Sequence, residues 1–200
     1  MIQSLLKILN TIHGNALLYA LFLALTMPFL IIAVGYCLNL LALAFAEMLS
    51  WFIDPWWVNV IINYFLFPGV MIHELSHATL ALITGAKVTE MKLFKKQGDS
   101  LGHVNIKHRG SPLLRAIQCI FIAAAPMFIG VIVVYGTFFA AFHFSGLHIA
   151  LKIFLIYIGI SMFFNMTMSK QDIKVYFGGI PVFMVMIFIL SLIMRFFKVI

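Results

Sequence analysis

Charged residues are scarce in this chain, and their scarcity excludes an ordinary soluble domain. Asp, Glu, Lys and Arg together make up 10% of the 200 residues, whereas about 25% is usual in soluble domains. Hydrophobic residues reach 64%, and the mean hydropathy is +1.12. The composition therefore predicts an integral membrane protein.

Cysteine is scarce as well. Cys37 and Cys119 both lie in apolar runs and cannot form a disulfide framework, so we expect them to act as small hydrophobic residues. No internal repeat and no low-complexity linker divides the chain. We therefore expect one transmembrane domain over residues 1–200.

The basic residues, which give a net charge of +7, form no stripe interleaved with exposed aromatic residues. They cluster instead at the ends of apolar runs, where they anchor membrane spans. This distribution argues against a nucleic-acid partner and for the lipid bilayer as the partner surface.

Five apolar runs are each long enough to cross the hydrocarbon core of a bilayer, which is about 30 Å thick. They cover residues 16–49, 58–84, 113–144, 149–168 and 175–197. The first run would measure about 51 Å as one helix, so it must tilt, kink at Pro28 or break into two spans. Residues 1–13 predict a short amphipathic helix at the membrane interface. The fold class is therefore an all-α polytopic membrane protein with five, or alternatively six, transmembrane helices.

Lys and Arg are divided unevenly between the two sides of these spans. Ten of them fall at the amino terminus, in the 86–115 loop and in the turn at 169–174, whereas three fall on the opposite side. Because positively charged loops stay in the cytoplasm, we expect a multi-pass protein of the cell membrane with the 86–115 loop on the cytoplasmic side.

The main polar stretch of the chain follows Gly85. Residues 88–94 and 102–106 flank Gln97-Gly98-Asp99-Ser100, a composition typical of turns. We therefore expect a small β-hairpin within a cytoplasmic-side loop at 86–112.

The second apolar run contains His73-Glu74-Leu75-Ser76-His77, the H-E-x-x-H pattern. On a helix, His73 and His77 lie one turn apart on the same face, so both rings can bind one Zn²⁺. Glu74 can then take a proton from a water molecule that the metal has acidified. The alternative, buried histidines satisfied by neighbours, does not explain three ionisable groups within an apolar span, which are costly there and indicate function.

This motif and its surroundings resemble the site-2 protease family of intramembrane zinc metalloproteases. The resemblance rests on residues 68–72 before the motif, 78–85 after it, the hairpin, Ala125-Pro126-Met127-Phe128-Ile129-Gly130, and Ser169-Lys170-Gln171-Asp172-Ile173. It implies that a carboxylate from a later span, here Asp172, completes the zinc site. The Leu-Asp-Gly form that many members show at this position is absent, as are inserted PDZ and CBS domains.

Topology tests the third ligand independently. His77 lies eight residues before Gly85, so the third ligand must come from the loop side of the membrane. The loop-side candidates are Asp172, Glu90, Asp99, His103 and His108. Asp172 is favoured because it directly adjoins an apolar run, and His103 is its main rival. Asp172 could instead pair with a neighbouring lysine in a solvated turn.

Other residues have candidate roles around this centre. Asn165, seven residues before Asp172, could orient a ligand or bind a substrate carbonyl, or could simply pack two helices. Pro68 and Gly69 predict a kink just before the motif. An extended substrate segment could pair with the strand at 88–94, in which case Val88, Met91 and Leu93 would line the substrate.

The sequence therefore predicts a zinc-dependent intramembrane endopeptidase that cleaves membrane proteins or peptides within or near their transmembrane segments. The alternative is a non-catalytic membrane subunit that holds a structural or relic zinc site and binds partner subunits. A metal transporter is disfavoured because ionisable groups are nearly absent from the other spans.

Overall fold

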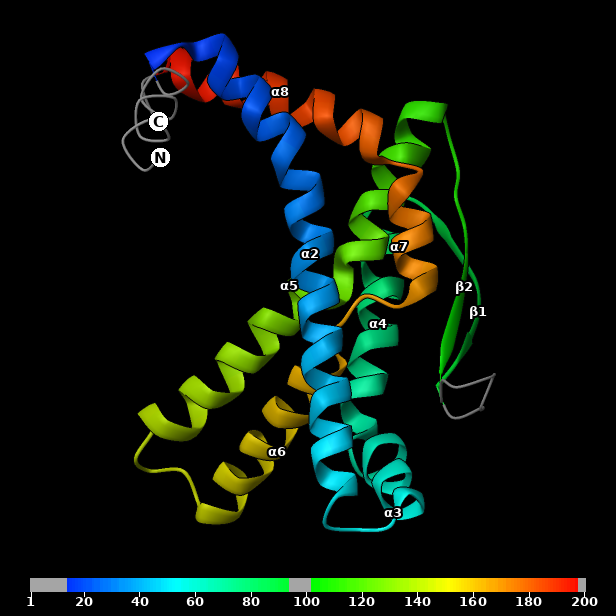
Figure 1. Cartoon of the computed structure of the whole chain (residues 1–200), viewed down its shortest axis with the longest axis vertical. Helices are drawn as coiled ribbons and strands as arrows, with labels where there is room; N and C mark the ends of the chain where they lie inside the picture. Colours follow the sequence, from blue (N-terminus) through cyan, green and yellow to red (C-terminus); the bar gives the residue numbers. More distant parts are fainter. Residues whose placement is uncertain (1–13, 94–101, 198–200) are drawn as a thin grey trace.

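The computed structural model describes residues 14–93 and 102–197 of the chain (Figure 1). Its elements, in chain order, are α2 (Ala16–Ser50), α3 (Pro55–Val60), the π-helical turn η1 (Ile61–Phe65), α4 (Phe67–Ile83), β1 (Lys87–Lys92), β2 (His103–Lys107), α5 (Pro112–His143), α6 (Ile149–Asn165), α7 (Lys170–Phe177) and α8 (Ile180–Phe196). A mostly helical fold with one small hairpin is therefore confirmed. The expected interfacial helix at 1–13 and the turn at 97–100 lie outside the described residues.

Two of the described helices, α2 and α5, are each long and apolar enough to cross a membrane. Two further pairs pass the same test together but are bent: α3–η1 with α4 by 48°, and α6 with α7 by 61°. Helix α8 is apolar but has 17 residues. The described structure thus offers two to four candidate spans, and the expected count of five stays a prediction.

Helix α2 is a single continuous helix of 35 residues, which excludes the break considered for the first apolar run. Its N-terminal part bends toward α8, which lies across that end of the molecule (Figure 1). At this end the Arg195 guanidinium lies 5.6 Å from the centre of the Tyr19 ring. The end of α8 is therefore held beside the beginning of α2.

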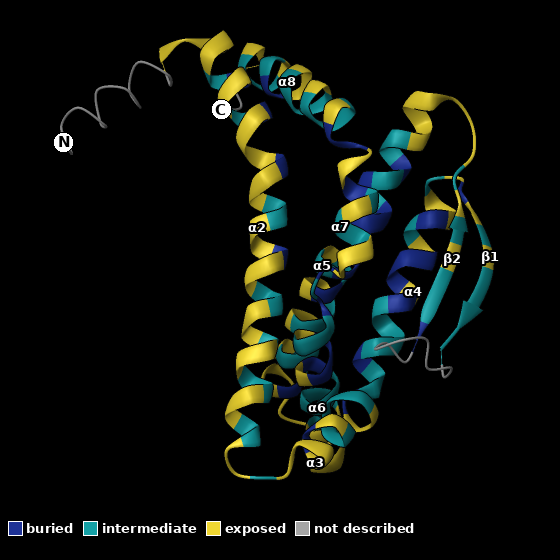
Figure 2. Cartoon of the chain, turned by 45° about the vertical axis from the view of Figure 1, so that its right-hand side comes forward, coloured by how far each residue is buried: buried dark blue, intermediate teal, exposed yellow. Residues whose placement is uncertain are grey.

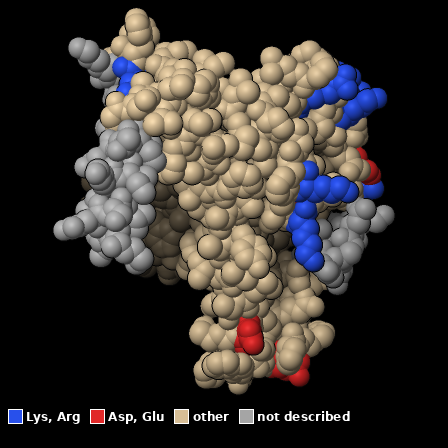
Figure 3. Space-filling view, turned by 45° about the horizontal axis from the view of Figure 1, so that its top comes forward, with Lys and Arg blue, Asp and Glu red and all other residues tan. Residues whose placement is uncertain are grey.

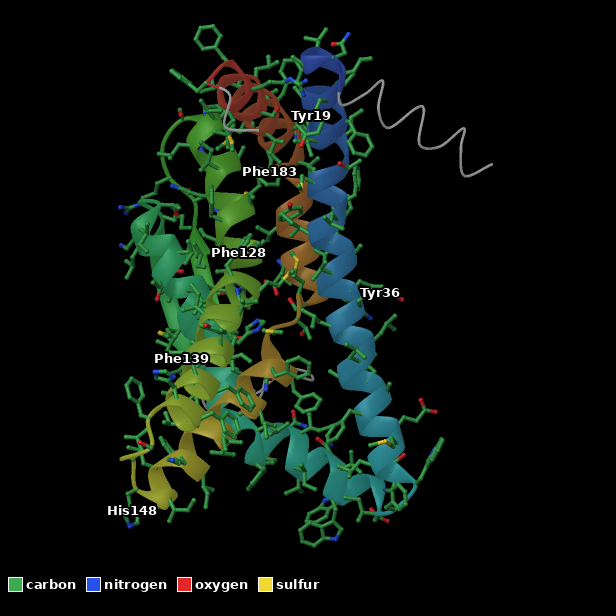
Figure 4. All side chains as sticks on the ribbon, turned by 90° about the vertical axis from the view of Figure 1, so that its left-hand side faces the viewer. Tyr19, Tyr36, Phe128, Phe139, His148 and Phe183 are labelled. Atoms are coloured by element: carbon green, nitrogen blue, oxygen red, sulfur yellow. The ribbon has the colours of Figure 1, made fainter. Side chains whose placement is uncertain are left out.

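Burial is concentrated in the middle of the helical assembly, above all in α4 and α5 (Figure 2). Small residues of α5, Ala123 and Ala124, are fully enclosed there and pack against Tyr176 of α7. Large apolar side chains such as Tyr36, Phe128 and Phe139 point outward (Figure 4). This apolar exterior is suited to a lipid environment.

The two strands pair antiparallel, with Lys87 opposite Lys107 and Lys92 opposite His103. The hairpin folds back along α4 (Figure 1). A six-residue strand spans about 20 Å, which matches the distance from Gly85 back to the motif in α4. The far end of the described hairpin therefore lies level with Glu74.

Candidate metal centre

The helix that carries the motif begins at a break stabilised by α6. Pro68 has no N–H group, and Leu66, two residues before it, leaves the helical conformation. The Ser161 hydroxyl accepts a hydrogen bond from Gly69 N at 2.7 Å and donates one to Leu66 O, also at 2.7 Å. Asn165 Nδ2 donates to Leu66 O at 3.3 Å. The expected kink is therefore present, and polar side chains of α6 satisfy the backbone groups that it frees.

Three side chains converge beyond this break. One donor atom from each of His73, His77 and Asp172 lies within 4.8 Å of the other two. The two Nε2 atoms are 3.2 Å apart, Asp172 Oδ1 is 3.3 Å from His77 Nε2, and Asp172 Oδ2 is 3.8 Å from His73 Nε2. The structure thus brings together the three residues that the sequence predicts as metal ligands.

Main-chain carbonyl groups fix the orientation of both rings. His73 Nδ1 lies 2.6 Å from Asn165 O, and His77 Nδ1 lies 2.7 Å from Ile122 O. A carbonyl oxygen only accepts hydrogen bonds, so each Nδ1 must carry the proton and donate. A neutral ring held in this tautomer presents the Nε2 lone pair to the other ring, which is the form that binds metals.

This geometry fits a zinc ion. Two Nε2 lone pairs that face each other at 3.2 Å repel unless a cation lies between them. Tetrahedral Zn²⁺ with Zn–N distances of 2.0–2.1 Å places neighbouring donors about 3.3 Å apart. Imidazole and carboxylate groups are also among the donors that bind zinc in proteins. The arrangement needs little adjustment to hold the ion.

Asp172 is oriented by the start of α7. Ser169 and Asp172 form a capping box, in which Ser169 Oγ accepts from Asp172 N at 3.1 Å and Asp172 Oδ2 accepts from Ser169 N at 2.8 Å. The bend between α6 and α7 aims this capped turn at α4. The carboxylate therefore faces the histidines, and within the described part of the chain it does not form the lysine pair that the sequence left open.

A cavity of about 340 Å³ opens beside the three ligands. Most of the residues that line it have polar side chains, in contrast to the exterior of the helices. The residues that border it besides the ligands are Asn63, Val70, Glu74, Gly102, His103, Val104, Asn165, Thr167, Ser169 and Gln171. Glu74, which is largely buried, thus faces the same space as the predicted metal ligands.

The beginning of β2 lies directly against Glu74. A Cβ atom at Gly102 would stand 2.9 Å from Glu74 Cγ, so the contact leaves no room for a side chain. By contrast, none of Val88, Met91 and Leu93 borders the cavity, and Val88 packs against α4 and α5. The structure therefore places β2, rather than the strand expected to bind substrate, beside the centre.

The other described candidates for the third ligand do not join the cluster of His73, His77 and Asp172. His103 borders the cavity, but its Nε2 faces Glu90 Oε2 at 3.7 Å. Hydrogen bonds from Lys92 and Asn105 hold the pKa of Glu90 below its usual value, which keeps this carboxylate ionised on the hairpin. His108 lies 3.9 Å from Cys119 Sγ, and burial lowers its pKa. Asp99 lies outside the described residues.

Several contributors to the site were not predicted from the sequence. Ser161 and Asn63 are polar residues within apolar runs, a signal that could have identified both. Thr167 and Ser169 in the connection before α7, and Gln171 in its first turn, also border the cavity. The carbonyl groups that orient the rings belong to the main chain, so the side chains of Asn165 and Ile122 do not identify them as hydrogen-bond acceptors.

Comparison of the chain with protein-family models, with curated protein sequences and with solved structures finds no match. The function is therefore argued from the geometry of the centre.

Proposed function

We propose that the chain is a zinc-dependent intramembrane endopeptidase. The observation that carries the proposal is the convergence of His73, His77 and Asp172, with both rings presenting Nε2, beside Glu74 and an open polar cavity. The cluster supplies three ligands within the described residues. Structural zinc sites usually close with four protein ligands, whereas catalytic sites keep one position open.

The reaction divides between the bound ion and the side chains of the chain. Zinc held by the three ligands would lower the pKa of water to about 7 and polarise the carbonyl group of the substrate. Glu74 takes a proton from the attacking water as the new C–O bond forms. Glu74 then delivers this proton to the nitrogen as the C–N bond breaks, which releases an amine and a carboxylate.

The cavity also indicates the form of the substrate. A peptide bond in an intact helix is shielded and its carbonyl is already hydrogen-bonded, so cleavage requires an unwound segment. Unwound backbone in a membrane needs polar partners. Asn63, Thr167 and Gln171 can supply them along the cavity. The proposed substrates are therefore membrane proteins or peptides that unwind locally in or near a transmembrane segment.

The proposed setting is a multi-pass protein of the cell membrane with the hairpin on the cytoplasmic side. The apolar exterior and the candidate spans support membrane insertion. In the view of Figure 3, Lys and Arg gather over the upper part and the right side of the surface, beside one acidic patch, whereas the lower tip carries Asp and Glu without Lys or Arg. This polarity supports the orientation that the Lys and Arg bias predicts.

Replacing Glu74 with Gln tests the catalytic role. We expect Glu74→Gln to retain zinc, measured by elemental analysis, and to cleave no member of a panel of synthetic single-span peptides in detergent. Glu47→Gln, an exposed position in α2, is the matched control and should cleave as the parent does. Zinc without any cleavage by the parent protein would instead favour the non-catalytic subunit.

A further inference from the structure

Pro126 stands in the middle of α5, as the fifteenth of its 32 residues. Proline in a helix interior has no N–H for the carbonyl four residues earlier, and its ring pushes that carbonyl aside. The carbonyl affected here belongs to Ile122. Helix α5 changes direction about midway along its length (Figure 1), as expected at an internal proline.

The carbonyl that Pro126 leaves free lies in the interior. Ile122 is 4% exposed, so this oxygen is shielded from water. A buried carbonyl without a partner costs free energy. His77 supplies the partner, because its Nδ1 donates to Ile122 O at 2.7 Å. The missing helical hydrogen bond of α5 is thus replaced by a hydrogen bond from the motif helix.

The carbonyl group that accepts the hydrogen bond from His73 is available for a different reason. Asn165 is the last residue of α6, where carbonyl groups have no intrahelical donor. Its oxygen can therefore accept from His73 without any special residue. Ile122 lies within a helix, so its oxygen would normally be occupied. Because Pro126 has no N–H, this oxygen lacks its helical donor and is available to His77.

We infer that Pro126 is a positioning residue of the metal centre. By lacking an N–H, it reserves the Ile122 carbonyl for His77, and this carbonyl fixes both the tautomer and the direction of the ring. The inference rests on the metal site of the proposed function, but it concerns metal binding rather than peptide cleavage.

The test uses Pro126→Ala and Pro126→Val, which restore an N–H with a smaller and a larger side chain. Pro28→Ala is the matched control, because Pro28 is also a buried proline inside a helix, and among the described residues the hydrogen bonds of the histidines do not reach that helix. Three properties are measured on the full chain: the zinc dissociation constant by chelator competition, the visible spectrum of the cobalt-substituted protein, and the thermal midpoint of the metal-free protein.

We expect both Pro126 variants to bind zinc about 10- to 100-fold more weakly, the usual effect of losing a partner of a metal ligand. Their cobalt spectra should change because the ring at His77 turns. The thermal midpoint of metal-free Pro126→Ala should not fall, because alanine is the better helix former. Pro28→Ala should match the parent in zinc affinity and cobalt spectrum.

Three results would overturn the inference. Zinc affinity and cobalt spectrum unchanged in both Pro126 variants would show that the N–H does not matter. Weaker zinc binding in only one Pro126 variant would indicate an effect of side-chain packing. Weaker zinc binding in both variants, together with a lower thermal midpoint of both metal-free proteins, would indicate the same. An equal loss in Pro28→Ala would indicate a general effect of helix prolines. A parent that binds zinc but cleaves no peptide would refute the proposed protease, whereas the zinc affinities would still decide the role of Pro126.

Discussion

The two histidine rings of the centre depend on main-chain rather than side-chain partners. Asn165 O and Ile122 O hold His73 and His77, so the backbone paths of α6 and α5 determine where the rings point. Asp172 is the single anionic donor of the described cluster, and its orientation depends on the cap of α7. Its charge should therefore dominate the retention of a divalent cation.

Replacing Asp172 with Asn tests this dependence. Asn keeps an oxygen for the hydrogen bond from Ser169 N but removes the negative charge. We expect zinc affinity to fall by more than about tenfold, because even the outer partners of metal ligands contribute that much. Zinc content by elemental analysis and chelator competition measure the effect.

His103→Asn is the control for this change, because His103 borders the same cavity without joining the ligand cluster. It should retain zinc at the level of the parent. If zinc were lost with His103→Asn and retained with Asp172→Asn, the assignment of the third ligand would be wrong.

The residues of the centre differ in how far the sequence could predict them. His73, Glu74 and His77 could be recognised because their relation is local, within one turn of a helix. Asp172 is distant in sequence and required a topological argument, which the convergence of donor atoms supports. The carbonyl partners could not be recognised directly, since every residue has a carbonyl. Only Pro126, four residues after Ile122, marks one of them.

Both helix pairs that build the centre are interrupted beside it. The break before α4 and the bend after α6 each free backbone groups within an apolar assembly. Hydrogen bonds from Ser161 and Asn165 satisfy the first break. The two interruptions bring the motif and the capped turn of Asp172 face to face, which straight helices of this length would not do.

The apolar runs predicted these helices, but not their bends. A run of hydrophobic residues specifies burial in lipid and says little about direction, because a bend depends on which polar side chain reaches the freed backbone. Pro68 predicted the break before α4 correctly. The bend after α6 has no proline in residues 166–169. The helix that follows it begins with the capping box of Ser169 and Asp172, which the apolar pattern does not reveal.

The crossing of α4 and α6 depends on Gly69. A Cβ atom at this position would lie 2.1 Å from Ser161 O, a main-chain atom that cannot turn away. Gly69→Ala should therefore force the helices apart and destabilise the fold by about 1–3 kcal/mol, the usual cost of overpacking. The thermal midpoint should fall, and zinc should bind more weakly because His73 moves away from Asn165 O.

Gly136→Ala provides the comparison for this substitution. Gly136 also lies within a helix, but a Cβ atom there meets nothing within 4 Å. Alanine should be neutral or stabilising by up to about 1 kcal/mol at such a position. Equal midpoints for the two variants would show that the close approach at Gly69 does not limit helix packing.

At the scale of the whole molecule, the described helices have two distinct ends. The beginning of α2, with Tyr19, lies at the same end as α8, whereas His148 lies in the turn at the opposite end (Figure 4). Arg195 reaches the Tyr19 ring, so the C-terminal part of α8 returns to the end where α2 begins. This position favours four crossings, with α8 lying across the end predicted to be cytoplasmic, over the five expected from the apolar runs.

Single-cysteine labelling distinguishes the two topologies. In a background with Cys37→Ala and Cys119→Ala, the three exposed positions to be changed are Lys107→Cys, Ser145→Cys and Phe197→Cys. If α8 lies across the cytoplasmic end, a membrane-impermeant thiol reagent should reach Ser145→Cys in intact cells, whereas Lys107→Cys and Phe197→Cys should react only after permeabilisation. If α8 crosses the membrane, Phe197→Cys should react together with Ser145→Cys. Labelling of Lys107→Cys in intact cells would reverse the orientation predicted from the Lys and Arg bias, whichever way α8 lies.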